Sequence, residues 1–319
     1  MFNQYEDYIN RLVDSGIEES EAKKEISILE SEIKDKEKIK SIIEKRIQTR
    51  TPIQYLIGKA YFMNFEVKVN NKVLIPRPET EILLEETVKR LICHCEERQR
   101  RSSPDRDCFV ADAPRSDIIT TLDIGTGSGI IAIALAKLIP DIKITAIDID
   151  KEIINLAKEN AKLNNVENKI NFKICDVFSK CFEGLLQNQK FDLIISNPPY
   201  VKPDELQKLK PEVFIHEPKL ALSGSKENKS GLVYYERIIS VIARKGKALT
   251  KQSHNRDNKC EIASPASGRL AMTQGCLLAF EIDPPLVEDL KRILKENNLN
   301  NYEIVKDYAK LDRCLFVHY

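Results

Sequence analysis

The second part of this 319-residue chain alternates strand-like and helix-like segments with short connections. From Ile118 onward, the expected strands are ITTLDI, KITAIDI, KINFKI, FDLIIS, CLLAFEI, YEIVKD and RCLFVHY. Segments with apolar residues at helical spacing separate most of them. Parallel strands need such crossovers, so the pattern predicts an α/β fold with a doubly wound, mostly parallel, seven-stranded sheet. Only a short loop joins the last two strands, so at least one should be antiparallel.

Residues 1–58 have the pattern of a small helical bundle. Apolar side chains recur at helical spacing among Glu, Lys and Ser, as stripes made of Ile9, Leu12 and Val13, of Ile26, Leu29 and Ile33, and of Ile39, Ile42, Ile43 and Ile47. Such stripes usually pack a core rather than bind a ligand. Gly16 is placed to end the first helix.

A linking β-hairpin and a helix are expected over residues 59–92. YFMNFEVKV and KVLI are interpreted as two strands around a turn at Asn70-Asn71, because Asn tolerates left-handed backbone angles. The loop from Arg77 to Glu81 then leads into a helix over 82–92. This unit would join the bundle to the α/β domain, residues 118–319.

Two segments interrupt the alternation, and both are predicted to be surface insertions. Residues 93–117 and 253–274 are rich in polar residues, with Arg, Ser and Asp in each, and lack strand or helix periodicity. The first contains Cys93, His94, Cys95 and Cys108. A Cys-x-Cys without a matched second pair is a weak zinc signal, so no metal site is expected.

The amino-acid composition excludes only a few classes of function. Lys plus Arg number 50 and Asp plus Glu 49, a balance that does not indicate a nucleic-acid coat or a polybasic membrane binder. The polar start lacks a signal-peptide run, and no apolar stretch approaches the ~20 residues of a membrane span. Cysteines are scattered, several within apolar runs, as at Cys175, Cys276 and Cys314. This usage is typical of a reduced cytoplasmic protein with buried thiols, not of a disulfide framework.

A glycine-rich loop, Asp123-Ile-Gly-Thr-Gly-Ser-Gly129, lies between an expected strand and helix. Glycines allow a sharp turn and let a ligand approach the backbone at a helix N-terminus. Alone, the loop suits NAD, FAD or S-adenosylmethionine. Asp148, which ends the next strand, can accept both ribose hydroxyls of a nucleoside cofactor. Its alternative role is a helix N-cap.

The fourth strand ends in Ser-Asn197-Pro-Pro-Tyr200, and this loop should face the cofactor crevice. A planar NH2 group is a poor nucleophile because its lone pair is delocalised. The Asn197 oxygen and the Pro198 carbonyl can each accept one of its N–H groups and so direct the lone pair, while two prolines keep the backbone rigid. Tyr200 offers a flat face for stacking. The alternative is a simple proline turn after a buried strand.

Two features support S-adenosylmethionine over NAD, namely the acidic Asp123 and, more decisively, the Asn-Pro-Pro-Tyr corner at the end of the fourth strand. Asp123 before the first glycine is typical of methyltransferases that hold the methionine part of the cofactor nearby. Asp176, after the third strand, is placed to meet the adenine amino group, with Val177 against the ring, although Asp176 could equally be a plain surface acid.

These motifs resemble the class I, Rossmann-like amino-methyltransferases, a group that includes adenine, guanine and protein-glutamine methyltransferases. The segment TPIQYLIGKAYFMNFEVKVNNKVLIPRPETE and the segment HEPKLALSG resemble the release-factor glutamine methyltransferases, the PrmC/HemK family. The resemblance spans the chain except for the two insertions. Some relatives carry a tRNA guanine methyltransferase behind this unit, but none is assigned here. The family usually has Gly-Gly-x-Asp-Gly after Ala-Leu, whereas this chain has a longer loop, Gly224 to Gly231, without the Asp.

The resemblance implies methylation of the glutamine side-chain nitrogen (N5) in the Gly-Gly-Gln loop of peptide chain release factors, with S-adenosyl-L-methionine as cofactor. It assigns cofactor contacts to Asp123, Ile124, Gly125, Thr126, Gly127, Asp148, Asp176, Val177 and Asn197. It assigns substrate contacts to Arg77, Glu79, Thr80, Asn197, Pro198, Pro199 and Tyr200. Asn197, Pro198 and Tyr200 are the expected catalytic residues. For residues 77–81, the alternative is a helix start with Thr80 and Glu81 as capping residues.

Two other functions stay open at this stage. A nucleic-acid base methyltransferase would need a basic face and a pocket for a flipped base, and the Arg-rich residues 98–106 could contact phosphate. A binding module that has lost activity through its insertions is the third reading. We expect a cytoplasmic monomer with release factors as partners, no membrane and no stable nucleic-acid partner.

Overall fold

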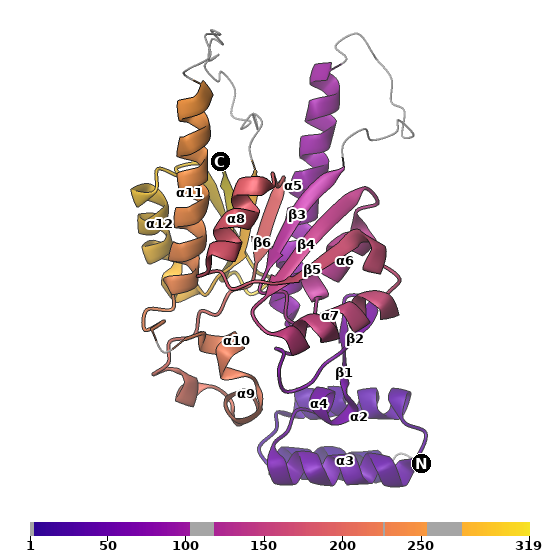
Figure 1. The fold of residues 1–319 in the computed structure, drawn as a ribbon. Coiled ribbons are helices and arrows are strands. Elements are labelled where there is room, and N and C mark those ends of the chain that lie inside the picture. The colour runs from indigo at the N-terminus through magenta and orange to yellow at the C-terminus, as the bar shows by residue number, and fades with distance from the viewer. Residues whose placement is uncertain (1–2, 103–117, 226, 254–275) are drawn as a thin grey trace.

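A computed structural model describes residues 3–102, 118–225, 227–253 and 276–319, and within them the side chains of 3–4, 92–102 and 245–253 are not described. Four N-terminal helices lie below a large sheet in Figure 1: α1 (Asn3–Asp14), α2 (Glu19–Glu32), α3 (Lys36–Thr49) and α4 (Ile53–Ile57). The apolar stripes of the first three helices pack into one core, in which Leu12, Leu29 and Ile43 are fully buried, whereas Val13 of the first predicted stripe is exposed. Gly16 follows the end of α1 with a φ of 89°, as predicted.

The linking hairpin turns earlier than predicted. Strands β1 (Lys59–Phe62) and β2 (Phe65–Lys68) are antiparallel, and Phe62 pairs with Phe65 across the turn. Both Phe side chains are buried, with ring centroids 5.8 Å apart, so their packing fixes the register. The predicted turn at Asn70-Asn71 is therefore wrong as the hairpin turn. There the Asn70 side chain accepts the Lys72 N–H and bends the chain after the hairpin.

The hairpin is fixed to the sheet through one buried amide. Asn160 on α7 (Lys151–Leu163) accepts the Lys68 N–H at 2.7 Å and donates to the Lys68 carbonyl at 2.9 Å. It also donates to the Ser128 carbonyl in the glycine-rich loop at 2.8 Å. The chain that follows the hairpin is thereby held beside that loop.

Helix α5 (Pro78–Ser102) is longer at both ends than the predicted helix over 82–92. The predicted insertion 93–117 thus begins inside a helix. Its first residues lack apolar periodicity, but Glu, Gln and Arg have high helix propensity, which suffices to extend an existing helix. The second insertion follows α11 (Val233–Ser253). Residues 103–117 and 254–275, and the side chains of Cys93, His94, Cys95 and Cys108, lie outside the described part of the chain.

The sheet has seven strands in the order β5-β4-β3-β6-β7-β9-β8. Their bounds are β3 (Ile119–Ile124), β4 (Ile142–Asp148), β5 (Ile170–Ile174), β6 (Leu193–Ser196), β7 (Leu277–Glu281), β8 (Tyr302–Lys306) and β9 (Asp312–His318). The first five pair in parallel, whereas β9 runs antiparallel to both neighbours. This confirms the predicted doubly wound, mostly parallel sheet.

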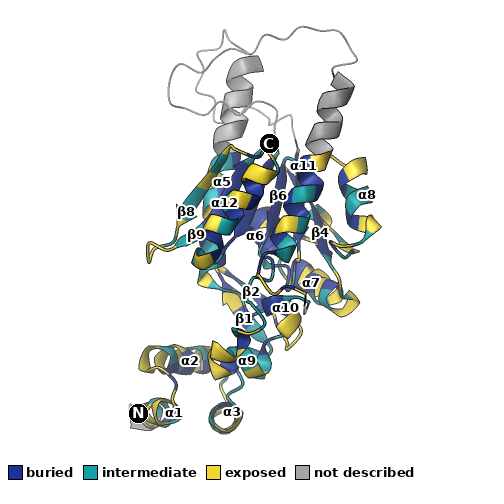
Figure 2. Ribbon diagram, turned by 90° about the vertical axis from the view of Figure 1, so that its left-hand side faces the viewer, coloured by how far each residue is buried: buried dark blue, intermediate teal, exposed yellow. Residues whose placement is uncertain are grey.

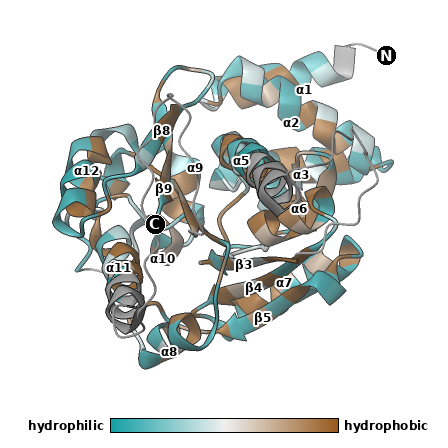
Figure 3. Cartoon of the chain, turned by 90° about the horizontal axis from the view of Figure 1, so that it is seen from above, coloured by the Kyte–Doolittle hydropathy of each residue, from teal (hydrophilic) through white to brown (hydrophobic). Residues whose placement is uncertain are grey.

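Helices cover both faces of the sheet, and buried residues concentrate between the layers (Figure 2). Leu193 and Ile195 of β6 join one core, with α5, α6 (Ile130–Leu138) and α7. Ile194, between them, joins the other core, formed with α8 (Lys180–Asn188), α11 and α12 (Val287–Glu296). Side chains alternate along a strand, so both faces must be apolar. Figure 3 shows this hydrophobicity on the strands.

The connection between β6 and α11 reaches back to the N-terminal bundle. It contains η2 (Leu206–Lys208), α9 (Pro211–His216) and α10 (Lys219–Ser223), and Figure 1 places α9 near that bundle. Arg46 of α3 contacts Glu212 of α9 at 3.2 Å. The short helices η1 (Glu167–Lys169) and η3 (Pro284–Leu286) complete the described elements. None of the helices in the described ranges could span a membrane.

Candidate active site

The chain order reverses between β3 and β6, and the crevice lies at their carboxyl ends. Ile124 pairs with Ser196, and the Ser196 hydroxyl donates to the Ile124 carbonyl at 2.8 Å. The next residues, Gly125 and Asn197, therefore start their loops side by side. Such a switch point is where doubly wound sheets bind ligands.

The glycine-rich loop bends sharply between β3 and α6. Gly125 and Gly127 have φ values of 71° and 54°, which a residue with a Cβ rarely adopts. A Cβ on Gly125 would meet no atom within 4 Å, so this backbone faces open space that a ligand can fill. Gly129 instead packs closely, because a Cβ there would lie 3.3 Å from Ala157.

Asp148 binds this loop rather than capping the next helix. Its Oδ2 accepts the Gly127 N–H at 3.0 Å, and its Oδ1 accepts the Ile149 N–H at 2.8 Å. Asp150 is the N-cap of α7 and accepts the Glu152 N–H, so the N-cap reading of Asp148 was wrong. Burial raises the pKa of Asp148, while the N–H of Gly127 opposes that rise.

Asp123 lies buried beneath the loop and does not line the cavity. Its Oδ2 accepts the Thr126 hydroxyl at 2.6 Å, whereas its Oδ1 has no hydrogen-bond partner. Burial raises the pKa of Asp123 to about 7, against the lowering effect of the Thr126 hydrogen bond. A buried acceptor without a donor is costly. A ligand that carries a positive charge near this loop would be favoured by Asp123.

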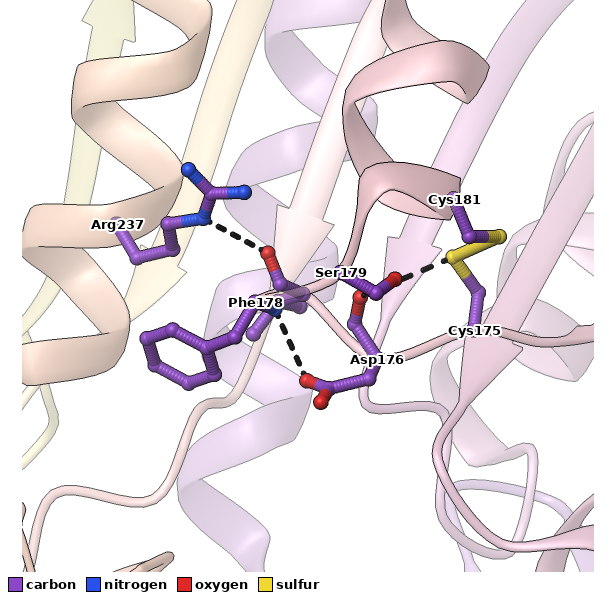
Figure 4. Close-up of a disulfide and its surroundings, with 7 residues drawn as sticks. Cys175, Asp176, Phe178, Ser179, Cys181 and Arg237 are labelled. Atoms are coloured by element: carbon purple, nitrogen blue, oxygen red, sulfur yellow. Dashed lines mark hydrogen bonds between the residues drawn. A yellow bond between two sulfur atoms is a disulfide. The ribbon is translucent and has the colours of Figure 1, made fainter.

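The loop after β5 also lines this crevice, and Figure 4 shows its residues beside a disulfide. Asp176 accepts the Phe178 N–H at 2.9 Å, and the Val177 carbonyl accepts Arg237 Nε at 2.9 Å. Cys175 is disulfide-bonded to Cys181, with a Cα–Cα distance of 6.0 Å. The expectation of a free thiol at Cys175 was therefore wrong. The turn that brings Cys181 back to the strand end is a local backbone conformation that the six-residue spacing alone does not specify.

The Asn-Pro-Pro-Tyr corner is held from behind by buried Asn228. This side chain donates to the carbonyls of Pro199 at 3.2 Å and Ser223 at 2.8 Å. Gly231 packs on the Tyr200 carbonyl so tightly that a Cβ would lie 2.4 Å from it. Tyr200 packs against the apolar core on the α11 side. The contacts with Asn228 and Gly231 therefore add to the rigidity that the two prolines give this corner.

Residues between the hairpin and the first turn of α5 form the remaining wall of the crevice. Arg77 Nη2 donates to both carboxylate oxygens of Glu217 at 2.7 Å, and Glu217 is buried. The Thr80 hydroxyl donates to Glu281 at 2.6 Å. Glu81 accepts the Met63 N–H. The capping reading of Thr80 and Glu81 was therefore wrong, since both side chains bind other elements.

These walls enclose one cavity of about 330 Å³. Its lining includes most of the predicted site residues, namely Arg77, Thr80, Ile124, Gly125, Thr126, Gly127, Asp148, Asp176, Val177, Asn197, Pro198 and Pro199. Three predicted residues, Asp123, Glu79 and Tyr200, are not among the lining residues.

Sequence reasoning missed several residues at this cavity. Ile153, Cys175 and Tyr234 line it, and Glu281 lies directly behind Thr80. Glu281 had a visible signal, because it is a carboxylate at the end of an apolar, strand-like run. Tyr234 had none, since it lies within an ordinary amphipathic helix.

A glycine-rich turn and an Asn-Pro-Pro-Tyr corner at one switch point define a class of protein, the S-adenosylmethionine-dependent methyltransferases. Residues 109–226 accordingly match the family described as "Methyltransferase small domain". The chain is 34% identical to a release factor glutamine methyltransferase of Thermodesulfovibrio yellowstonii, over 88% of this chain and 80% of that one. It is 32% identical to one of Chlorobaculum tepidum, over 89% and 79%. This chain belongs to the release factor glutamine methyltransferase family.

Proposed function

We propose that this chain transfers the methyl group of S-adenosyl-L-methionine to the glutamine amide nitrogen (N5) in the Gly-Gly-Gln loop of peptide chain release factors. The observation that carries the proposal is the adjacency of Gly125 and Asn197. The first begins a loop suited to a nucleoside cofactor, and the second begins a corner suited to an NH2 group. Both line one cavity, so donor and acceptor could meet there.

The cofactor would be held mainly by the first three loops of the crevice. Backbone at Gly125 to Gly127 would bind its amino-acid part, with the unpartnered oxygen of Asp123 beneath. Asp148 would accept the ribose hydroxyls with its remaining lone pairs, because each of its oxygens already accepts one backbone N–H, from Gly127 or Ile149. Asp176 and Val177 would bind the adenine. When bound, S-adenosylmethionine supplies the electrophilic methyl carbon.

The glutamine amide would be oriented by Asn197 and Pro198. The Asn197 side-chain oxygen and the Pro198 carbonyl would each accept one N–H, which fixes the plane of the NH2 group. Tyr200 would act mainly from behind, by supporting the corner. Its packing against the core favours this role over stacking on the substrate.

The substrate entrance would be formed by Arg77, Glu79 and Thr80. Arg77 is held by Glu217, so its guanidinium is already oriented on the cavity wall. Residues 1–58 would recognise the body of the release factor, residues 59–92 would link them to the site, and residues 118–319 would carry catalysis. We further propose that the enzyme acts as a monomer in the cytoplasm, without a stable nucleic-acid partner.

Methyl transfer from labelled S-adenosylmethionine tests the proposal. Purified release factor, the same factor with its Gly-Gly-Gln glutamine replaced by Ala, and total RNA are incubated in parallel with the enzyme. Label is expected only in the unaltered release factor, at the glutamine. Label in RNA instead of protein, or equal label in both forms of the factor, would refute it.

A further inference from the structure

A buried carboxylate stands directly behind the Asn-Pro-Pro-Tyr corner. Glu281 is the last residue of β7 and is 1% exposed. Strands β6 and β7 are parallel, with Ser196 opposite Phe280. Asn197 and Glu281 come directly after these two paired residues, so both lie at the same end of the two strands.

Three elements converge on Glu281. The Thr80 hydroxyl of α5 donates to its Oε2 at 2.6 Å. The Tyr235 hydroxyl of α11 donates to its main-chain carbonyl at 2.7 Å. The Asn197 side chain lies close enough to this carboxylate to lower its pKa. The carboxylate therefore has a fixed position beside the residue proposed to orient the substrate.

We propose that Glu281 is a positioning residue that sets which end of the Asn197 carboxamide faces the substrate. An ionised carboxylate can only accept hydrogen bonds, so it binds the NH2 end of Asn197. The Asn197 oxygen then points away from Glu281 and is free to accept an N–H from the glutamine amide. This inference rests on the proposed function, because the direction matters only if the substrate group is a donor.

Because Glu281 can be protonated, the orientation of the Asn197 carboxamide should depend on pH. The pKa of Glu281 is raised to about 7, because burial and the charge of Glu79 raise it more than Thr80, Arg313 and Asn197 lower it. Tyr200, Tyr235 and Cys314 also face this charge. Below that pKa, the protonated acid can donate to the Asn197 oxygen and allow the reversed carboxamide. Turnover is therefore expected to fall as the pH drops through about 7.

Glu281→Gln tests the proposal, because an amide keeps the shape but can donate to the Asn197 oxygen. We expect kcat to fall by about tenfold or more, with the low-pH limb of kcat lost. The KM for release factor and the affinity for S-adenosylmethionine should change less than about threefold. Glu159→Gln is the matched control, since it makes the same change at an exposed carboxylate, one that pairs with Lys68 on the surface. It should keep kcat within about twofold and keep the low-pH limb.

A second measurement does not need methyl transfer. The side-chain NH2 signal of Asn197, identified by its loss in Asn197→Ala, is followed by NMR as the pH is varied. It should titrate in the wild type and not in Glu281→Gln. An unchanged kcat and pH profile in Glu281→Gln would overturn the proposal. So would an Asn197 signal that shows the same pH dependence in the wild type and in Glu281→Gln. A wild-type enzyme that fails to methylate release factor while this signal titrates would instead refute the proposed function alone.

Discussion

At the scale of single residues, Asp123 shows how a binding site is kept at the expense of stability. Its carboxylate is fully buried, and one of its oxygens has no partner. An apolar residue of similar size would avoid that desolvation. The acid ends up beneath the cofactor loop, where a charge is useful only when a ligand is bound.

The stability of the unliganded protein should therefore depend on pH at Asp123. The pKa of Asp123 is about 7 when folded and near 4 in an unfolded chain. The folded state then binds more protons, so the Asp123 contribution to the free energy of unfolding is complete below pH ~4 and lost as the pH rises through about 7. Asp123→Asn removes this pH-dependent contribution to the free energy of unfolding. Urea unfolding of both proteins should show the variant gaining stability relative to the wild type between pH 5 and pH 8. A constant difference would contradict this.

Asn197 is expected to contribute to turnover much more than to cofactor binding. Asn197→Ala removes one of the two proposed acceptors of the substrate amide, so kcat should fall by about a hundredfold or more. The affinity for S-adenosylmethionine, measured by calorimetry, should change much less. Turnover near the wild-type rate would contradict the proposed mechanism.

At the scale of elements, the loop from Gly224 to Gly231 supports the corner despite its departure from the usual family sequence. Asn228 within it holds Pro199, and Gly231 packs on the Tyr200 carbonyl. The loop thus acts as a brace for the catalytic strand end. The missing acid of the family pattern is not needed for this contact.

The brace can be tested with two glycines that share a backbone conformation. Gly231 and Gly58 both have a φ of 75°, but a Cβ at Gly231 would collide with Tyr200, and one at Gly58 would meet nothing within 4 Å. Gly58→Ala should lose about 1 kcal/mol of unfolding free energy from backbone strain alone. Gly231→Ala should lose more and should also lower kcat. Urea unfolding and methyl transfer measure the two effects, and equal losses in both variants would contradict the brace.

At the scale of the whole molecule, one buried arginine joins the N-terminal bundle to the catalytic domain. Arg46 is 1% exposed and donates to Glu25 of α2 at 3.0 and 3.1 Å and to Glu212 of α9 at 3.2 Å. Arg50 pairs with the same Glu212. These charges link the bundle to the segment that follows the Asn-Pro-Pro-Tyr corner.

Removing this arginine should destabilise the protein strongly. Arg46→Ala leaves buried Glu25 without its main partner and leaves Glu212 with Arg50 alone, and an unpaired buried charge typically costs about 3–5 kcal/mol. Lys68→Ala, which breaks the exposed pair with Glu159, is the control and should change stability little. Urea unfolding compares the two. A small effect of Arg46→Ala would show that the bundle is held mainly by apolar contacts.

Sequence alone determined the features that are local or periodic. The succession of strands and helices, the glycine-rich turn and the Asn-Pro-Pro-Tyr corner could be predicted because each depends on neighbouring residues and on the known ends of parallel strands. The predicted helix ended too early at residue 92 for a related reason. Polar helix formers extend a helix without any apolar signal.

Only the folded structure decided which side chains meet. The hairpin turn was fixed by packing between Phe62 and Phe65, and the Cys175–Cys181 bond by a turn after β5. The contact of Thr80 with Glu281 joins residues far apart in the chain. Such pairings depend on how elements stack, and burial then sets the ionisation of the groups involved. A linear pattern carries the residue types needed for this chemistry, whereas their distances and exposure come only from the folded chain.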